Sequence, residues 1–200
     1  MEHSDEYRKF MKYLGSSIQE KLDGFDDDLL EKIYDWERDE VEDIIWNMFH
    51  GVAGGVFACY LPKLSNYDGL NALKRSLSEY SNIETAKVLY ESTGDDSYLD
   101  VFMENYNKSN GEGYSIVAAL TYCKPCKKMF EILCDIYLNA DEKLAVQQAA
   151  KGIFYYIKGI NPNNLTWEEE KTYLPIWSKL ADCEKSEREK YLKKETEDEI

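Results

Sequence analysis

The sequence is poor in the residues on which many catalytic sites and metal centres depend. It contains two histidines among 200 residues, His3 and His50. A Gly-rich phosphate loop, a His-Glu-x-x-His segment and a Gly-x-Ser-x-Gly segment are all missing. His50 has no neighbouring serine or cysteine to activate, so we expect it to pack between helices beside Phe49 rather than to act as a base. We therefore predict no catalytic residues, no bound metal, no cofactor and no enzymatic activity.

Long apolar runs are missing as well. No run approaches the roughly 18 residues that a membrane span needs. The first ten residues, MEHSDEYRKF, lack the apolar segment of a signal peptide. Five cysteines, an odd number without a secretory signal, are typical of reduced thiols. These features predict a cytoplasmic protein that does not interact with membranes.

Positive charge is scarce and unevenly distributed. The 24 Lys and Arg face 39 Asp and Glu, which gives a formal net charge of −15. This charge argues against binding to nucleic acids or anionic membranes, because both are negative themselves. Glu20 to Asp43 alone contains twelve acidic and three basic residues, a balance of −9, whereas Cys123 to Ile160 has a balance of +2.

The acidic segment has two interpretations. It is a solvated helix face with favourable N-terminal carboxylates, or it is a surface that steers a basic protein partner into place. Trp36 and Trp46 lie in the same segment and belong either to an interface or to the core. The candidate partner-binding residues are Asp26, Asp27, Asp28, Asp35, Trp36, Glu37, Asp39, Glu40, Glu42, Asp43 and Trp46.

The periodicity of apolar residues predicts an all-α fold with internal repeats. Val41, Ile44 and Met48 lie at helical spacing, and equivalent triplets recur after 29, 29 and 30 residues. They are Leu70, Leu73 and Leu77, then Leu99, Phe102 and Tyr106, then Met129, Ile132 and Ile136. A second helix follows each triplet, and its register begins at Ala53, Thr85, Ile116 and Val146 in the four repeats. Recurring helix pairs of about 30 residues are typical of an α-solenoid, in which each unit is buried against its neighbours.

We therefore predict a single domain over residues 1–200 with three parts. Residues 1–38 form N-terminal capping helices, expected at 7–22 and 29–36. Residues 39–158 form about four antiparallel two-helix repeats, and residues 159–200 form a C-terminal capping helix with a charged tail. We expect Leu73, Phe102, Ile132 and Ala149 to be buried, and Leu174, Trp177 and Leu180 to point inward from the last helix. Ser81 to Glu84 and Thr166 to Glu169 have the pattern of capping boxes, and Pro125 is expected at the first position of a helix.

Cys123-Lys124-Pro125-Cys126 matches the spacing of a redox or zinc-binding pair. A thioredoxin-type motif requires a preceding strand, which the sequence does not indicate, and a zinc site requires two further ligands. The remaining interpretation is two structural thiols beside the start of a helix, and we favour it.

The segment Val146-Gln147-Gln148-Ala149-Ala150, with Asp141 before it and Ile153 after it, resembles the inner helix of a HEAT repeat. The family usually has an arginine where Gln147 stands here, so the ladder of Asp–Arg pairs that joins HEAT units is absent. The resemblance covers about residues 39–158 and implies a short HEAT-like solenoid.

The segment Ile44-Ile45-Trp46-Asn47-Met48-Phe49-His50, within Asp39 to Leu64, is similar to HEAT-like immunity proteins of bacterial polymorphic toxin systems. That resemblance implies an acidic, cytosolic protein that binds and neutralises a cognate basic toxin. A scaffold or adaptor with an unrelated partner is the alternative. A HEAT-like DNA glycosylase would need a basic groove, which Lys124, Lys127 and Lys128 are too few to form.

Overall fold

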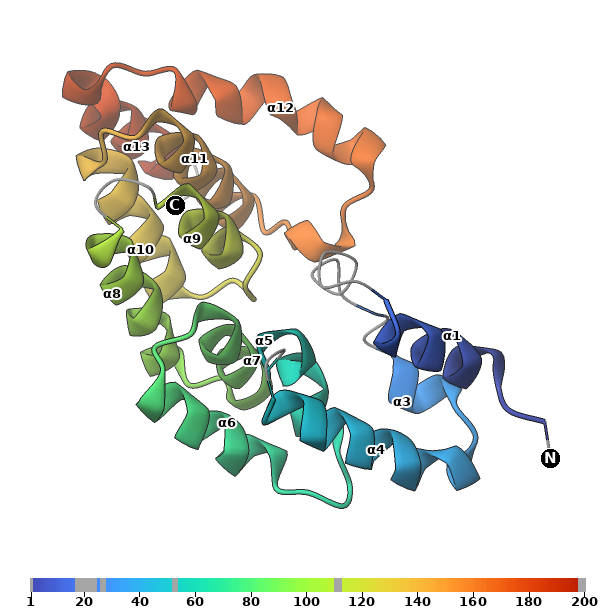
Figure 1. Ribbon diagram of the computed structural model, residues 1–200. Helices are drawn as coiled ribbons and strands as arrows, with labels where there is room; N and C mark the ends of the chain where they lie inside the picture. Colours follow the sequence, from blue (N-terminus) through green and yellow to red (C-terminus); the bar gives the residue numbers. More distant parts are fainter. Residues whose placement is uncertain (1, 17–24, 26–27, 52–53, 110–112, 198–200) are drawn as a thin grey trace. The chain divides into compact units, whose positions relative to one another are not determined.

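The computed structural model describes residues 2–16, 25, 28–51, 54–109 and 113–197 (Figure 1). The predicted all-α class is confirmed, with twelve α-helices and no strand in these ranges. The α-helices are α1 (Asp5–Leu14), α3 (Leu29–Lys32), α4 (Asp35–Phe49), α5 (Gly54–Phe57), α6 (Gly69–Glu79), α7 (Ile83–Thr93), α8 (Asp100–Lys108), α9 (Tyr114–Thr121), α10 (Lys127–Asn139), α11 (Lys143–Ile157), α12 (Trp167–Ala181) and α13 (Arg188–Glu197). Short 3-10 helices are η1 (Ala58–Lys63), η2 (Asp96–Leu99), η3 (Pro162–Asn164) and η4 (Lys185–Glu187). No helix among the described residues is long and apolar enough to cross a membrane.

The chain divides into two compact units, residues 1–92 and 93–200. The boundary falls at the last residue of α7, inside the segment 39–158 assigned to the repeats. Each unit has its own buried apolar core.

In the first unit, α4 packs against α5 and η1, and η1 also packs against α6. Gly69 opens α6 at the closest approach of these elements. A Cβ atom at this position would overlap the Leu61 carbonyl oxygen of η1. A residue without a side chain is therefore required for α6 to begin here.

In the second unit, α11 is the central helix and packs against α9, α10 and α12. Its small residues allow the close approach. A Cβ atom on Gly152 would lie 2.7 Å from Leu133 Cδ1 of α10 and 3.0 Å from Thr121 Oγ1 of α9. The buried positions Ala145, Ala149 and Ala150 line the same helix and keep its neighbours close.

The N-terminal helices differ from the prediction of helices at 7–22 and 29–36. α1 begins at Asp5, and residues 17–24 lie outside the described part of the chain. α3 ends at Lys32, and Tyr34 has an extended backbone. The Glu37 carboxylate accepts the Tyr34 backbone N–H at 2.9 Å, so a new helix, α4, begins at Asp35. Asp35 and its neighbour Trp36 thus belong to the first turn of α4 and not to the helix expected at 29–36.

The C-terminal segment follows the prediction in part. Thr166 and Glu169 form the expected capping box of α12, and Leu180 is buried. The inward orientation expected for Leu174 is wrong, because this side chain is 48% exposed. Within the charged segment, residues 185–197 are helical, and Arg188 is buried.

Two contacts hold this C-terminal segment against α10. The Arg188 guanidinium donates to the carbonyl oxygens of Tyr137 and Ala140 at 2.9 and 2.8 Å. The Tyr137 hydroxyl donates to the Leu180 carbonyl oxygen at 2.9 Å. One cation thus satisfies carbonyl groups at the C-terminal end of α10, where a positive charge is favourable.

The predicted core residues are confirmed. Leu73, Phe102, Ile132 and Ala149 are all buried, with at most 8% of their surface exposed. The other members of the four apolar triplets are buried or half-buried. The helical period therefore identified the inward faces of α4, α6, α8 and α10 correctly.

Replacing Phe102 with alanine should lower the free energy of unfolding by about 3–5 kcal/mol, because it empties an aromatic site in a packed core. The measurement is urea unfolding of the variant and the parent protein. The control is Leu144→Ala on α11, which removes a side chain that is 52% exposed and should change stability by less than about 0.5 kcal/mol. Equal losses for the two variants would contradict the assigned core.

Candidate functional site

One face of α4 gathers exposed acidic side chains. Asp35, Asp39, Glu40 and Asp43 are all exposed. Asp35, Asp39 and Asp43 follow one another at intervals of four residues, and Glu40 precedes Asp43 by three, so the four side chains lie along one side of the helix. We call these four residues the acidic face. The indole of Trp36 lies in the same stripe and is 45% exposed.

Not every acidic residue of α4 reaches this surface. Glu42 is fully buried, and its carboxylate accepts the backbone N–H groups of Ser65 and Asn66 at 2.9 and 2.8 Å. The Ser65 hydroxyl and the Arg38 guanidinium donate to it at 2.8 Å as well. Burial alone would raise the pKa of Glu42, but these hydrogen bonds outweigh it, and the pKa is lowered.

Arg38 is the only cation in α4, and its guanidinium binds groups of the surrounding fold instead of the carboxylates of the acidic face. Besides Glu42, its guanidinium contacts the carbonyl oxygens of Leu30 and Lys63, each at 3.0 Å. Arg38 thus connects α4 to α3 and to the end of η1. The acidic face consequently has no opposing charge from its own helix.

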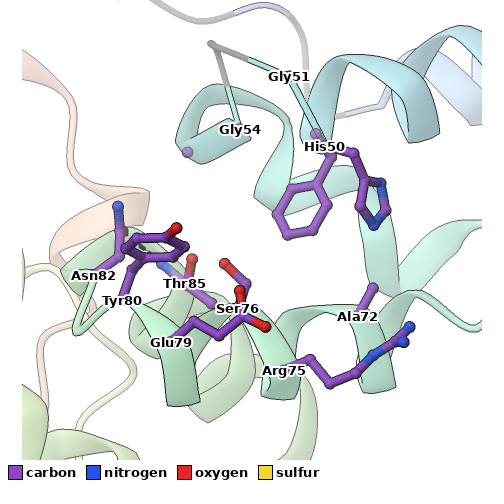
Figure 2. A pocket seen from close by; sticks show the side chains of 12 residues that line it. His50, Gly51, Gly54, Ala72, Arg75, Ser76, Glu79, Tyr80, Asn82 and Thr85 are labelled. Atoms are coloured by element: carbon purple, nitrogen blue, oxygen red, sulfur yellow. Dashed lines mark hydrogen bonds between the residues drawn. The ribbon is translucent and has the colours of Figure 1, made fainter.

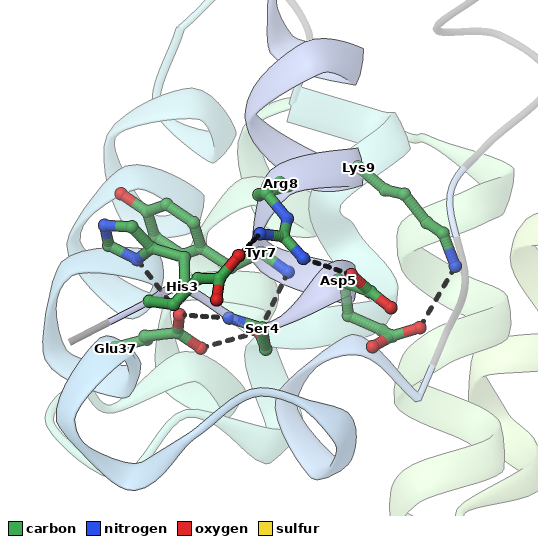
Figure 3. A network of polar contacts seen from close by, with 9 residues as sticks. His3, Ser4, Asp5, Tyr7, Arg8, Lys9 and Glu37 are labelled. Carbon is green, nitrogen blue, oxygen red and sulfur yellow. Dashed lines mark hydrogen bonds and ion pairs between the residues drawn. The ribbon is translucent and has the colours of Figure 1, made fainter.

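Glu37 is the second buried acid of α4, and it organises the N-terminus of the chain (Figure 3). Its carboxylate accepts the backbone N–H and the hydroxyl of Ser4 at 2.8 and 2.7 Å. The Nδ1 atom of His3 lies 3.0 Å from the same carboxylate, which also accepts the Tyr34 N–H. Burial alone would raise the pKa of Glu37, but the hydrogen bonds lower it overall.

Burial thus divides the predicted partner-binding residues. Glu37 and Glu42 are enclosed in the fold, so they are not part of an exposed surface. Asp28 is exposed and lies 3.8 Å from Lys32. Asp26 and Asp27 lie outside the described residues.

The two tryptophans of the segment have different environments. Trp46 is half-buried, and its ring stacks on Tyr67 with centroids 4.5 Å apart and an interplanar angle of 13°. The Tyr67 hydroxyl donates to Asp43 at 2.6 Å, which joins this stack to the acidic face. Trp36 is instead exposed at the other end of α4, beside Tyr34, which is 52% exposed.

The interpretation as two buried thiols flanking a helix start holds in part, because both cysteines precede α10 and only Cys123 is buried, whereas Cys126 is half-buried. Cys123 is buried, and its thiol lies 3.4 Å from the Ala119 carbonyl oxygen. Cys126 is the N-cap of α10, and its sulfur accepts the Met129 N–H at 3.4 Å. Pro125 therefore precedes the cap and is not the first helical residue. Within the described residues, no three His, Cys, Asp or Glu side chains come together as a set of metal ligands.

A pocket of about 550 Å³ lies in the first unit and was not indicated by the sequence (Figure 2). Its walls come from the end of α4 and from parts of α5, α6 and α7, with Arg75, Glu79 and Asn82 as polar groups. His50 lines it and is exposed, so the expectation that this residue is packed between helices is wrong. The His50 Nδ1 atom lies 2.8 Å from the Trp46 carbonyl oxygen. The walls carry one cation, Arg75, and one anion, Glu79, so they favour neither a negatively nor a positively charged ligand.

The second unit contains a buried ammonium group that sequence reasoning also missed. The Lys151 side chain of α11 is 8% exposed, donates to the Tyr122 hydroxyl at 2.8 Å and pairs with Glu170 of α12. Burial alone would lower the pKa of Lys151, but the bonds to Glu170 and Tyr122 outweigh it and raise the pKa. Lys151 therefore stays protonated and holds α12 on α11. The signal in the sequence is a lone lysine on the otherwise apolar inner face of a helix.

No protein-family model, no curated protein and no solved structure matched this chain.

Replacing Glu37 with glutamine should lower the free energy of unfolding at neutral pH by about 1–3 kcal/mol, because buried donors lose a charged acceptor. A lowered pKa in the folded state means that Glu37 stabilises the fold above the ordinary glutamate pKa of 4.5. This contribution disappears as the pH falls through the lower value of the folded state. The difference between parent and variant should therefore shrink on acidification, as measured by urea unfolding at several pH values.

The control for this prediction is Glu31→Gln on α3. Glu31 is exposed and lies 3.6 Å from Lys63, so its loss should change stability by less than about 0.5 kcal/mol at any pH. A Glu37→Gln variant that differs from the parent by the same amount at neutral and acidic pH would refute the assigned role of this carboxylate.

Proposed function

We propose that this chain is a non-enzymatic binding protein whose acidic face captures a basic protein partner in the cytoplasm. The observation that carries the proposal is the exposed stripe of four carboxylates on α4, beside an exposed tryptophan. Like charges in one place repel each other and weaken the fold, so their concentration is better explained by a partner that neutralises them. Exposed carboxylates on one face also accelerate encounter with a cationic surface.

The type of binding protein that fits best is an immunity protein of a bacterial toxin system. A toxin that cleaves nucleic acid needs a cationic surface to hold phosphates. The acidic face would occupy that surface in place of the phosphates and so block the toxin. The charge of −15, together with the segment from Ile44 to His50 that is similar to HEAT-like immunity proteins, supports this choice.

We further propose that the helix pairs are HEAT-like repeats of a short solenoid. The pairs follow one another in the expected order, as α4 with α5, α6 with α7, α8 with α9 and α10 with α11. Their apolar triplets are buried or half-buried, as stacked repeats require. α1 and α3 would cap the first repeat, and α12 and α13 the last one.

The test uses the protein encoded next to this chain's gene, expressed together with it. For an immunity protein we expect a basic toxin domain that forms a complex with this chain and loses its toxicity. Changing Asp35, Glu40 and Asp43 together to lysine should lower the association rate about tenfold or more, and added salt should lower it in the parent. Surface plasmon resonance at several salt concentrations measures both effects.

The matched control reverses three exposed acids of the second unit, Glu104, Glu131 and Asp135, and should leave the association rate nearly unchanged. Circular dichroism checks that both triple variants are folded. If the neighbouring protein is acidic, or if its binding is indifferent to salt and to the reversal on α4, electrostatic capture is refuted. A complex without any loss of toxicity would favour a scaffold or adaptor.

A further inference from the structure

Beside the acidic face, four aromatic rings from two parts of the chain form a continuous row. Tyr34 and Trp36 have centroids 6.4 Å apart, Trp36 and His3 4.8 Å, and His3 and Tyr7 4.1 Å. Tyr7 is buried, whereas Tyr34 and Trp36 are 52% and 45% exposed. The row therefore begins in the core and ends as an exposed aromatic surface.

Glu37 fixes this row. Its buried carboxylate accepts the Ser4 backbone N–H and lies 3.0 Å from His3 Nδ1 (Figure 3). The same carboxylate accepts the Tyr34 backbone N–H, so both segments that supply rings meet at one charged acceptor. Exposed rings that are held in place lose little conformational freedom when a ligand binds, which is how tyrosine and tryptophan act at protein interfaces.

The surroundings of the exposed rings are negative. Asp39 and Glu40 follow Trp36 by three and four residues and share its side of α4. A cation over an indole ring is attracted by the ring itself, and neighbouring carboxylates add to that attraction. Elsewhere in this chain an exposed tryptophan already binds a cation, since the Lys171 ammonium lies 5.0 Å from the ring centre of Trp167. Within the described residues, no such contact involves Trp36.

We infer that the exposed end of the row, Tyr34 and Trp36, binds an arginine side chain of the basic partner. The guanidinium stacks on Trp36 and donates hydrogen bonds to the carboxylates of Asp39 and Glu40. Arginine fits better than lysine, because its planar group stacks on a ring and presents several donors in a fixed fork, whereas an ammonium keeps its water more tightly. This inference rests on the proposed function and names the residue type that the acidic face selects.

The test compares two peptides of equal formal charge, nona-arginine and nona-lysine, by isothermal titration calorimetry with the full chain. The arginine peptide should bind more tightly. Trp36→Leu keeps an apolar side chain but removes the ring, and it should weaken arginine-peptide binding about three- to thirty-fold, with a smaller effect on the lysine peptide. Trp36→Phe should retain part of the affinity. The control, Trp167→Leu on α12, should leave both affinities unchanged, and thermal unfolding checks that every variant is folded.

The outcomes separate this inference from the proposed function. Equal binding of the two peptides, no measurable binding of nona-arginine, or no effect of Trp36→Leu would each overturn the arginine site. If the peptides bind equally or Trp36→Leu has no effect, but the triple reversal on α4 still weakens peptide binding, the acidic face stands as a purely electrostatic surface. Failure of the proposed function itself is decided by the neighbouring protein and its toxicity, which do not depend on the peptides.

Discussion

The arrangement of α4 depends on two carboxylates that are buried within it. Glu37 holds the N-terminal segment through Ser4, and Glu42 holds the segment after η1 through Ser65. A buried charge is costly unless hydrogen bonds compensate for the lost water, and each of these carboxylates accepts several. Because the donors come from distant parts of the chain, the two groups fix the rotation of α4 about its axis, and that rotation decides which acids face the solvent.

Local periodicity explains how much of the fold was predictable. The apolar spacing identified α6 to α11 and the burial of Phe102 and Ile132, because a helix buries one side whatever it packs against. It failed where a polar contact sets the boundary. Apolar residues continue through Ile33 and Tyr34, but the hydrogen bond that the Tyr34 N–H donates to the Glu37 carboxylate starts a new helix there. α13 depends in the same way on Arg188, whose carbonyl partners lie some fifty residues earlier.

The candidate site shows the same limit more sharply. Glu37 and Glu40 have the same side chain in the same acidic helix, yet one is buried and the other exposed. What differs is the presence of Ser4 beside Glu37, which composition cannot reveal. Trp36 and Trp46 differ likewise. Tyr67 stacks on the Trp46 ring and covers it, whereas the Trp36 ring is exposed. Sequence therefore located the acidic helix but not the rotation that defines its surface.

The division between buried and exposed acids has a physical consequence for binding. Exposed charges are screened by salt over about 8 Å at physiological ionic strength, whereas buried, hydrogen-bonded charges are screened much less. Glu37 and Glu42 are buried and hydrogen-bonded, so salt should weaken the contacts that hold α4 in place only slightly. The carboxylates of the acidic face are exposed, so salt screens their charge. Moderate salt should therefore weaken the proposed electrostatic capture without loosening the helix that carries the acidic face.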